Sequence, residues 1–228
     1  MENIKSKSKI GVIILLSLML VLTGCKDKDN SSNKTNSDKS EKQKISITTT
    51  APVTTPIVTT TKPTVIKSDF RNIKWGMTIS QVKILEDSKL LDETQDGLLY
   101  SNLKVSSYDT QLIYNFEDNK LVKGSYLLNQ KHSNTIDYIS DYNNLKKQYI
   151  NIYGKPIKDD VVWKDDLFKD DPNSYGTALF AGHLIYHAKW QTTTTDIDII
   201  LGADNFGIIF SVLYQQKGYQ PKDNNDGI

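Results

Sequence analysis

Two histidines, His183 and His187, stand four residues apart in the segment HLIYH, a spacing at which two side chains on a helix can share a metal ion. The metalloprotease form of this motif needs glutamate directly after the first histidine, and Leu184 stands there. The neighbouring residues alternate between apolar and polar, which predicts a strand. On a strand these side chains would lie roughly 13 Å apart. We therefore expect neither a shared metal ion nor a cofactor.

Four aspartates gather in KDDLFKDDPN, namely Asp165, Asp166, Asp170 and Asp171. Calcium prefers oxygen ligands, but the spacing and the central glycine of an EF-hand loop are absent and lysines interleave. Paired carboxylates also serve acid–base catalysis, yet the chain has neither a GxSxG motif nor a glycine-rich phosphate loop. The pattern favours a solvated acidic loop and no catalytic residue. A hydrolase or metal-dependent enzyme acting on the cell envelope is the alternative hypothesis.

Cys25 is the only cysteine of the chain. An intramolecular disulfide is therefore excluded, as are a cysteine nucleophile and a cysteine-based zinc site elsewhere in the chain. The cysteine follows three lysines and an apolar run of about 12 residues (10–21), too short for a bilayer core, which needs about 20. The basic start, the short apolar run and the small residues before Cys25 together predict a secretory signal peptide over residues 1–24.

The tetrapeptide Leu22-Thr23-Gly24-Cys25 resembles the lipobox of bacterial lipoproteins. The resemblance implies cleavage between Gly24 and Cys25 and attachment of fatty acyl chains such as palmitate to Cys25. Each buried CH₂ contributes about 0.8 kcal/mol, so two or three chains anchor a protein stably where one does not. The partner implied is the membrane, and the expected location is its extracytoplasmic face in a Gram-positive bacterium.

Residues 25–67 are expected to be a disordered linker. The first part is rich in Lys, Asn and Ser, and the second in Thr with three prolines, so neither can bury enough apolar surface to fold. The linker is either a stalk through a cell wall or a tether without preferred length. Residues 1–67 carry roughly 11 Lys against 5 acids, while the remainder is mildly acidic. Nucleic acid is therefore not an expected partner.

Residues 68–217 have the patterns of a folded domain, followed by a tail at 218–228 that reads as disordered. Thr78-Ile79-Ser80-Gln81 is a capping box that predicts a helix over 79–87. Alternation predicts strands at 99–108, 112–117 and 122–128, with a turn at Asp118-Asn119. A second helix is expected over 135–153, because Tyr138, Tyr142, Leu145, Tyr149 and Ile152 form one apolar stripe.

Strands are then expected at 161–163, 184–190, 197–201 and 208–214, with a turn at 203–205. The order is helix then three strands, followed by helix then three or four strands. Strands joined by short turns pair antiparallel, and a helix covers one face. The predicted fold class is therefore α+β, with two tandem helix-plus-antiparallel-sheet units over about 68–130 and 131–217.

The segment FRNIKWGMTISQV (70–82) and the later Tyr153-Gly154-Lys155-Pro156 resemble the small lipoprotein domains typified by the SmpA/OmlA outer-membrane assembly lipoproteins and the β-lactamase inhibitory protein. The similarity extends to lipoproteins of low-GC Gram-positive bacteria. It implies two similar α+β layers. The chain lacks the disulfides of the inhibitor, so inhibition of β-lactamase does not carry over.

The second face of the C-terminal strands is the candidate interaction face. It is less polar than a solvated face should be. Either the other repeat or a partner covers this face. If a partner does, replacing Ile185 and Ile200 by lysine should cost little stability, whereas a face packed on the other repeat would not tolerate the change. We expect a non-enzymatic binding module for a cell-envelope protein or a wall component. The candidate residues are His183, Ile185, His187, Asp198, Ile200, Ile209 and Leu213.

Overall fold

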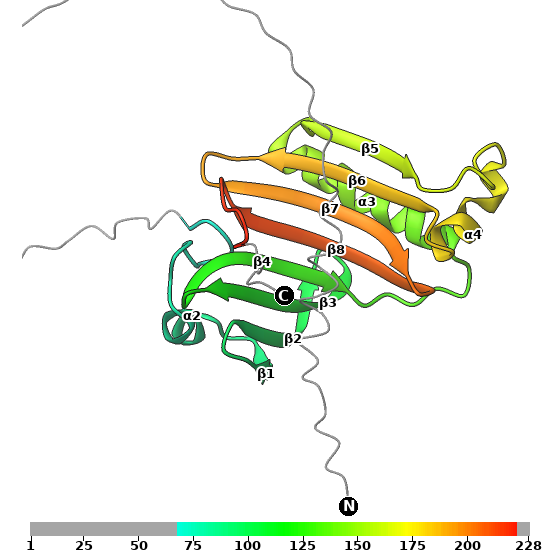
Figure 1. The fold of residues 1–228 in the computed structure, drawn as a ribbon. Coiled ribbons are helices and arrows are strands. Elements are labelled where there is room, and N and C mark those ends of the chain that lie inside the picture. Colours follow the sequence, from blue (N-terminus) through cyan, green and yellow to red (C-terminus); the bar gives the residue numbers. More distant parts are fainter. Residues whose placement is uncertain (1–67, 223–228) are drawn as a thin grey trace, which may run out of the picture. The chain divides into compact units, whose positions relative to one another are not determined.

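Eight antiparallel strands form one continuous sheet in the computed structural model, which describes residues 68–222 (Figure 1). The strand order is β1-β2-β3-β4-β8-β7-β6-β5, so the last strand of the chain lies at the centre of the sheet. The strands are β1 (Lys89–Glu93), β2 (Gly97–Val105), β3 (Tyr108–Glu117), β4 (Lys120–Leu128), β5 (Lys158–Trp163), β6 (Leu184–Gln191), β7 (Thr195–Asp204) and β8 (Gly207–Gln216). The helices are α2 (Ile79–Leu85), α3 (Ile136–Tyr153) and α4 (Tyr175–Phe180), with a 3₁₀ turn at Pro172–Ser174.

Helix α2 begins where the sequence predicts it. The Thr78 side chain accepts a hydrogen bond from the Gln81 backbone, and the Gln81 side chain accepts one from the Thr78 backbone N–H. Both bonds satisfy N–H groups that the first helical turn leaves without partners. Helix α3 ends at Gly154, whose φ of 80° lies in the left-handed region that glycine adopts readily.

Two hairpins close with turns in which both central residues have positive φ. Asp118 and Asn119 make the β3–β4 turn, and Asn205 and Phe206 make the β7–β8 turn between Asp204 and Gly207. This is the pattern of a type I′ turn, whose twist matches that of the flanking strands. The second turn lies one residue beyond its predicted position.

All three helices lie on one face of the sheet. Val82 of α2, the buried stripe of α3 and Leu179 of α4 belong to the same apolar core as the inward side chains of the strands. Helix α3 packs on β6 and β7, while α4 contacts β6, β7 and β8. The core is rich in aromatic residues, and its largest fully buried side chains include Trp190, Tyr114, Tyr142 and Phe210. We call this side of the sheet the covered face.

The segment before α2 closes the core over the first strands. The ring of Phe70 lies so close to Gly124 of β4 that a Cβ there would sit 2.2 Å from a ring carbon. The same ring packs 4.6 Å from the Tyr214 ring and 5.3 Å from the Tyr126 ring, measured between centroids. Glycine in β4 is therefore required for this approach.

The α+β class with an antiparallel sheet is confirmed, but several details differ from the prediction. The first helix precedes four strands rather than three, because β1 at the sheet edge is mostly exposed and lacks clear alternation. The strands form one sheet instead of two layers. The α3 stripe is buried as far as Tyr149, whereas Ile152 is 69% exposed in the last turn. The short helix α4 was not predicted.

Several predictions concern segments outside the described residues. These are the signal peptide 1–24, the lipid attachment at Cys25, the linker 25–67 and the end of the predicted tail, 223–228. Within 68–222, every helix is too short or too polar to cross a membrane.

Candidate interaction face

The side of the sheet opposite the helices carries the polar and aliphatic residues that the sequence singled out. We call this side the open face, because no helix within residues 68–222 packs against it. Cross-strand pairing aligns His187, Ile200 and Ser211 in one row across β6, β7 and β8. Lys189, Asp198 and Leu213 form a neighbouring row. Residues paired in this way point to the same side of a sheet. Alternation along β6 adds Ile185, and Gly202 pairs with Ile209.

A histidine–carboxylate pair lies near the middle of these strands. His187 Nε2 is 2.6 Å from Asp198 Oδ1, and each side chain is only 12% exposed. The other ring nitrogen, Nδ1, is buried and has no hydrogen-bond partner within the described part of the chain. With Nε2–H donating to the carboxylate, Nδ1 is an acceptor that still lacks a donor. The pair thus fixes the imidazole ring on the open face, with Nδ1 shielded from solvent.

Three neighbouring residues extend this pair into a network that the sequence did not predict. Lys189 Nζ lies 3.8 Å from a carboxylate oxygen of Asp198 and equally far from one of Asp196. Gln191 Nε2 donates to Asp196 Oδ1 at 2.6 Å. The sequence held one signal for these residues. Each lies two or four residues from His187 or Asp198 on the same strand, so alternation places it on the same side of the sheet. We call these five residues the β6–β7 network.

Aliphatic side chains surround the β6–β7 network. Ile200, Ile209 and Leu213 are half-buried, and Ile185 is only 2% exposed. The burial of Ile185 corrects one expectation, because its replacement by lysine would desolvate a charge and destabilise the domain. Ile200 has partial access to solvent, and so do the other two residues. The open face thus mixes paired polar groups with aliphatic surface.

His183 lies apart from the other candidate residues. It directly precedes β6, its backbone carbonyl accepts from Lys164 N at 2.7 Å, and its ring stacks on Phe168 at 6.0 Å between centroids. These contacts join His183 to the acidic loop 164–171. The structure therefore brings together six of the seven predicted residues and leaves His183 at the end of the sheet.

The other end of the open face is crossed by residues 218–222, the described part of the predicted tail. Lys123 Nζ lies 5.3 Å from the centre of the Tyr219 ring. The Lys222 backbone N–H donates to Glu117 at 3.2 Å, and its side chain pairs with Asp118. Lys123 is only 7% exposed, and burial lowers its pKa from the ordinary value although Glu117 opposes this effect. These contacts fix the segment beside the β3–β4 turn.

The geometry of the open face is unsuited to nucleophilic catalysis. The hydroxyl-bearing residue in line with His187 is Ser211, but Ile200 stands between them on β7. Two interstrand spacings separate Ser211 from His187, about 9–10 Å, whereas a nucleophile and its base must approach to about 3 Å. In residues 68–222 no three side chains of the metal-ligating types gather into a site.

A second histidine–carboxylate pair lies on the side of α3. His132 Nε2 is 2.6 Å from Asp141 Oδ2, and the Tyr108 hydroxyl donates to the other oxygen of the same carboxylate at 3.3 Å. His132 also packs edge-to-face against Tyr138. These bonds connect the start of α3 to β3, which is a structural role.

A hollow of about 510 Å³ opens beside the β3–β4 turn. Its lining residues include two carboxylates and no histidine, serine or lysine, and one of the carboxylates is paired with Lys222. Asp118 is held by Lys222, and Asp96 accepts a hydrogen bond from the Thr94 hydroxyl at 3.0 Å, so both carboxylates have structural partners. The lining residues are Gln95, Asp96, Phe116, Asp118 and Asn119.

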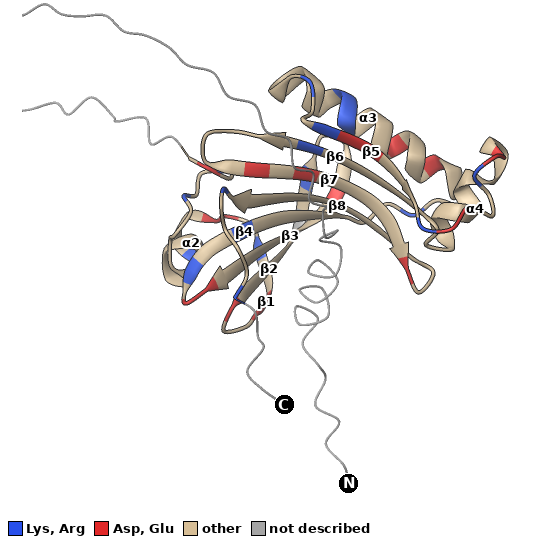
Figure 2. Ribbon diagram, turned by 45° about the horizontal axis from the view of Figure 1, so that its top comes forward, with Lys and Arg blue, Asp and Glu red and all other residues tan. Residues whose placement is uncertain are grey.

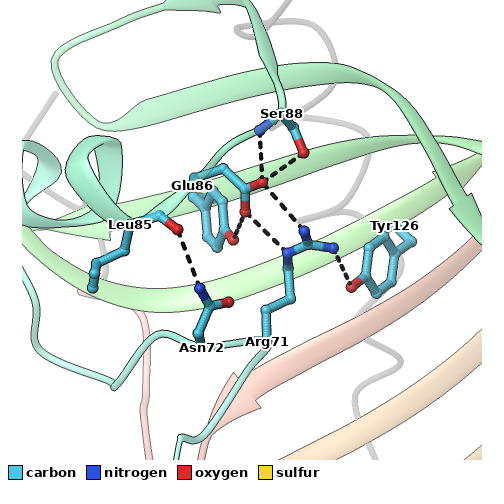
Figure 3. A network of polar contacts seen from close by, with 7 residues as sticks. Arg71, Asn72, Leu85, Glu86, Ser88 and Tyr126 are labelled. Atoms are coloured by element: carbon cyan, nitrogen blue, oxygen red, sulfur yellow. Dashed lines mark hydrogen bonds and ion pairs between the residues drawn. The ribbon is translucent and has the colours of Figure 1, made fainter.

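A further polar network surrounds the buried carboxylate of Glu86 at the end of α2 (Figure 3). Glu86 accepts hydrogen bonds from Arg71 Nε and from the hydroxyls of Tyr114 and Ser88, and Arg71 also donates to the Tyr126 hydroxyl. Burial raises the pKa of Glu86, but the bonds from Ser88 and Tyr114 and the charge of Arg71 outweigh it and leave the pKa below its ordinary value. The network holds Arg71 at a φ of 53°. Every oxygen of Glu86 is engaged, so its role is structural.

Comparison with known proteins yields no relative: no family model matches the chain, and neither a curated protein nor a solved structure resembles it significantly.

Proposed function

We propose that this protein is a lipid-anchored, extracytoplasmic binding module of the cell envelope that recognises its partner through the open face of its sheet. The observation that carries the proposal is the composition of that face. It joins the partly satisfied β6–β7 network to three half-buried aliphatic residues, Ile200, Ile209 and Leu213. Apolar surface with a few oriented polar groups is typical of protein recognition sites.

The lack of a catalytic arrangement supports binding over hydrolysis. Within residues 68–222, Ser211 lies two strand spacings from His187, and both carboxylates of the hollow at the β3–β4 turn are held by structural partners. Pairing of His187 with Asp198 instead fixes the orientation of the imidazole ring. Oriented polar groups of this kind contribute specificity to a complex, because a partner must match their fixed positions.

A second part of the proposal concerns the fold, which we infer to be a tandem repeat. One helix and four strands, α2 with β1–β4, precede a second helix with four strands, α3 with β5–β8. From the central pair outward, the strand order is β4-β3-β2-β1 on one side and β8-β7-β6-β5 on the other. We propose that the two halves are equivalent units joined along this central pair. In this arrangement the open face spans both units and offers a larger surface than either.

The anchoring proposal is tested at Cys25. Cells that express the full chain and its Cys25→Ala variant are labelled with a palmitate analogue. The wild-type chain should incorporate the label and be shortened to residues 25–228, whereas the variant should remain unlabelled and uncleaved. Label in the variant would contradict lipid attachment at this residue.

The binding proposal is tested by capture from detergent-solubilised envelope membranes with the mature chain as bait. The double variant Ile200→Lys/Leu213→Lys places two charges on the open face at half-buried positions. Ile152→Lys is the matched control, because Ile152 is exposed on α3. Wild type and control should retain one common partner, and the double variant should lose it while keeping its thermal unfolding transition. Retention of the same partner by all three proteins would refute the open face as the binding surface.

A further inference from the structure

The β7–β8 turn holds an aromatic residue in a backbone conformation that disfavours it. Phe206 has a φ of 59°, and Asn205 before it has 46°. The second central position of a type I′ turn favours glycine, and positive φ is a real outlier for a bulky side chain. The β3–β4 turn has the same geometry but uses Asp118 and Asn119, which tolerate it. The chain thus accepts strain at Phe206 that it avoids in the equivalent turn.

The Phe206 ring is exposed and has an exposed aromatic neighbour. Phe206 is 68% exposed, and its ring centre lies 5.5 Å from that of Phe180, which is 40% exposed at the end of α4. The turn after α4 lies against the end of β7, since a Cβ on Gly182 would approach the Ala203 carbonyl oxygen to 3.2 Å. We call Phe180 and Phe206 the aromatic tip.

Acidic residues lie at the same end of the sheet as the aromatic tip. Asp204 flanks the turn, and the acidic loop 164–171 meets the same end of the sheet through His183 (Figure 2). Asp165, Asp166, Asp170, Asp171 and Asp204 outnumber Lys164 and Lys169. This charge repels an anionic lipid surface and another copy of the same tip, and it attracts a basic surface.

We propose that the aromatic tip docks into an apolar pocket, rimmed by lysine or arginine, on a protein partner. Aromatic residues are enriched in the buried centres of interfaces, and complementary charge around them raises the association rate and selects the partner. Strained backbone that persists at an exposed site is a mark of function, because a more stable residue is available. This proposal uses different residues from the open face, so either can fail alone.

The experiment places the photo-cross-linking amino acid p-benzoylphenylalanine at position 180 of the full chain in living cells. Irradiation should give one discrete protein adduct. Phe206→Gly should reduce its yield about tenfold or more, as expected for loss of an interface anchor. This variant keeps its fold, because glycine suits the turn. Asp165→Lys/Asp166→Lys should reduce the yield as well, while Ile200→Lys/Leu213→Lys tests the open face separately. The probe at Ile152, which is 69% exposed on α3, is the control.

Mass spectrometry of the adduct decides between the outcomes. Cross-linked residues in an apolar pocket with basic neighbours, from a protein other than this one, would support the proposal. An adduct with phospholipid only, an adduct with a second copy of the chain, or a yield unchanged by Phe206→Gly would overturn it. Absence of any adduct specific to position 180 would overturn it too.

Discussion

The two faces of the sheet use their side chains differently. The covered face is continuous, aromatic and apolar. The hydroxyls of Tyr149 and Tyr214 bond to one another there at 2.7 Å, and the buried hydroxyl of Tyr142 has no partner within the described residues. The open face alternates aliphatic side chains with ion pairs, and a buried nitrogen of His187 lacks a partner within the described residues. The covered face is organised for stability. The open face interrupts its aliphatic surface with charged pairs that a purely apolar stabilising surface would not need.

The largest effect is expected on the covered face, at Trp190. This side chain is 2% exposed, and its Nε1 donates to the Gly154 carbonyl at 2.8 Å. Trp190→Ala removes a large buried ring and leaves that carbonyl without its donor, so it should cost about 4 kcal/mol of unfolding free energy. Urea unfolding measures this cost. Ile152→Ala, at an exposed position, should change it by less than about 0.5 kcal/mol.

The second effect concerns Glu86 and acid. Because the pKa of Glu86 is lowered in the folded state, its stabilisation is present above the ordinary value of 4.5 and is lost as pH falls through the lowered pKa. Glu86→Gln should cost about 3 kcal/mol at neutral pH, since Arg71 loses its partner, and should flatten the decline below pH 4.5. Unfolding measured from pH 7 to pH 3 tests this. Glu93→Gln, in a pair exposed to solvent, should leave the profile unchanged.

A smaller effect is expected from the polar pair on the open face. His187→Leu leaves the carboxylate of Asp198 buried without its 2.6 Å partner and should cost about 2 kcal/mol. The double variant His187→Leu/Asp198→Leu should cost less than this single variant, because both polar groups are removed together. A double variant that costs the sum of the two single effects would show that His187 and Asp198 act independently, which would contradict the expected coupling between them.

The smallest effect is a gain. Phe206→Gly should raise the unfolding free energy by about 1 kcal/mol, because glycine adopts positive φ without strain. Differential scanning calorimetry should register a higher Tm. Asn119→Gly in the β3–β4 turn is the matched control and should gain less, since asparagine already tolerates this conformation. An equal gain in both turns would remove the argument that strain is specific to Phe206.

Periodicity in the sequence was sufficient for most of the covered face. The α3 stripe from Tyr138 to Tyr149 and the alternation of β6, β7 and β8 were predicted correctly because these elements bury a regular set of side chains. Helix α4 and strand β1 were missed for the opposite reason. Helix α4 is six residues long, and β1 lies exposed at the sheet edge with a bulge at Leu91.

The open face was predicted only in part. Alternation alone placed Ile185, His187, Asp198 and Ile200 on one side. The ion pairs of Lys189 depend on which residues of β7 stand opposite β6, and cross-strand register is set by hairpins and packing that a single sequence does not display. The Glu86 network was missed because Arg71, Glu86, Tyr114 and Tyr126 are distant along the chain and meet only in the fold.

The central position of β8 determines when the sheet can be completed. As the chain is made from its N-terminus, β4 presents an unpaired edge throughout synthesis of the next ninety or so residues, since its partner β8 is the last strand to appear. The β4–β8 pairing spans a long sequence separation, and contacts of this kind slow folding. The rate-limiting step should therefore be insertion of β8 between β4 and β7, with the unpaired β4 edge as the aggregation-prone feature of the intermediate.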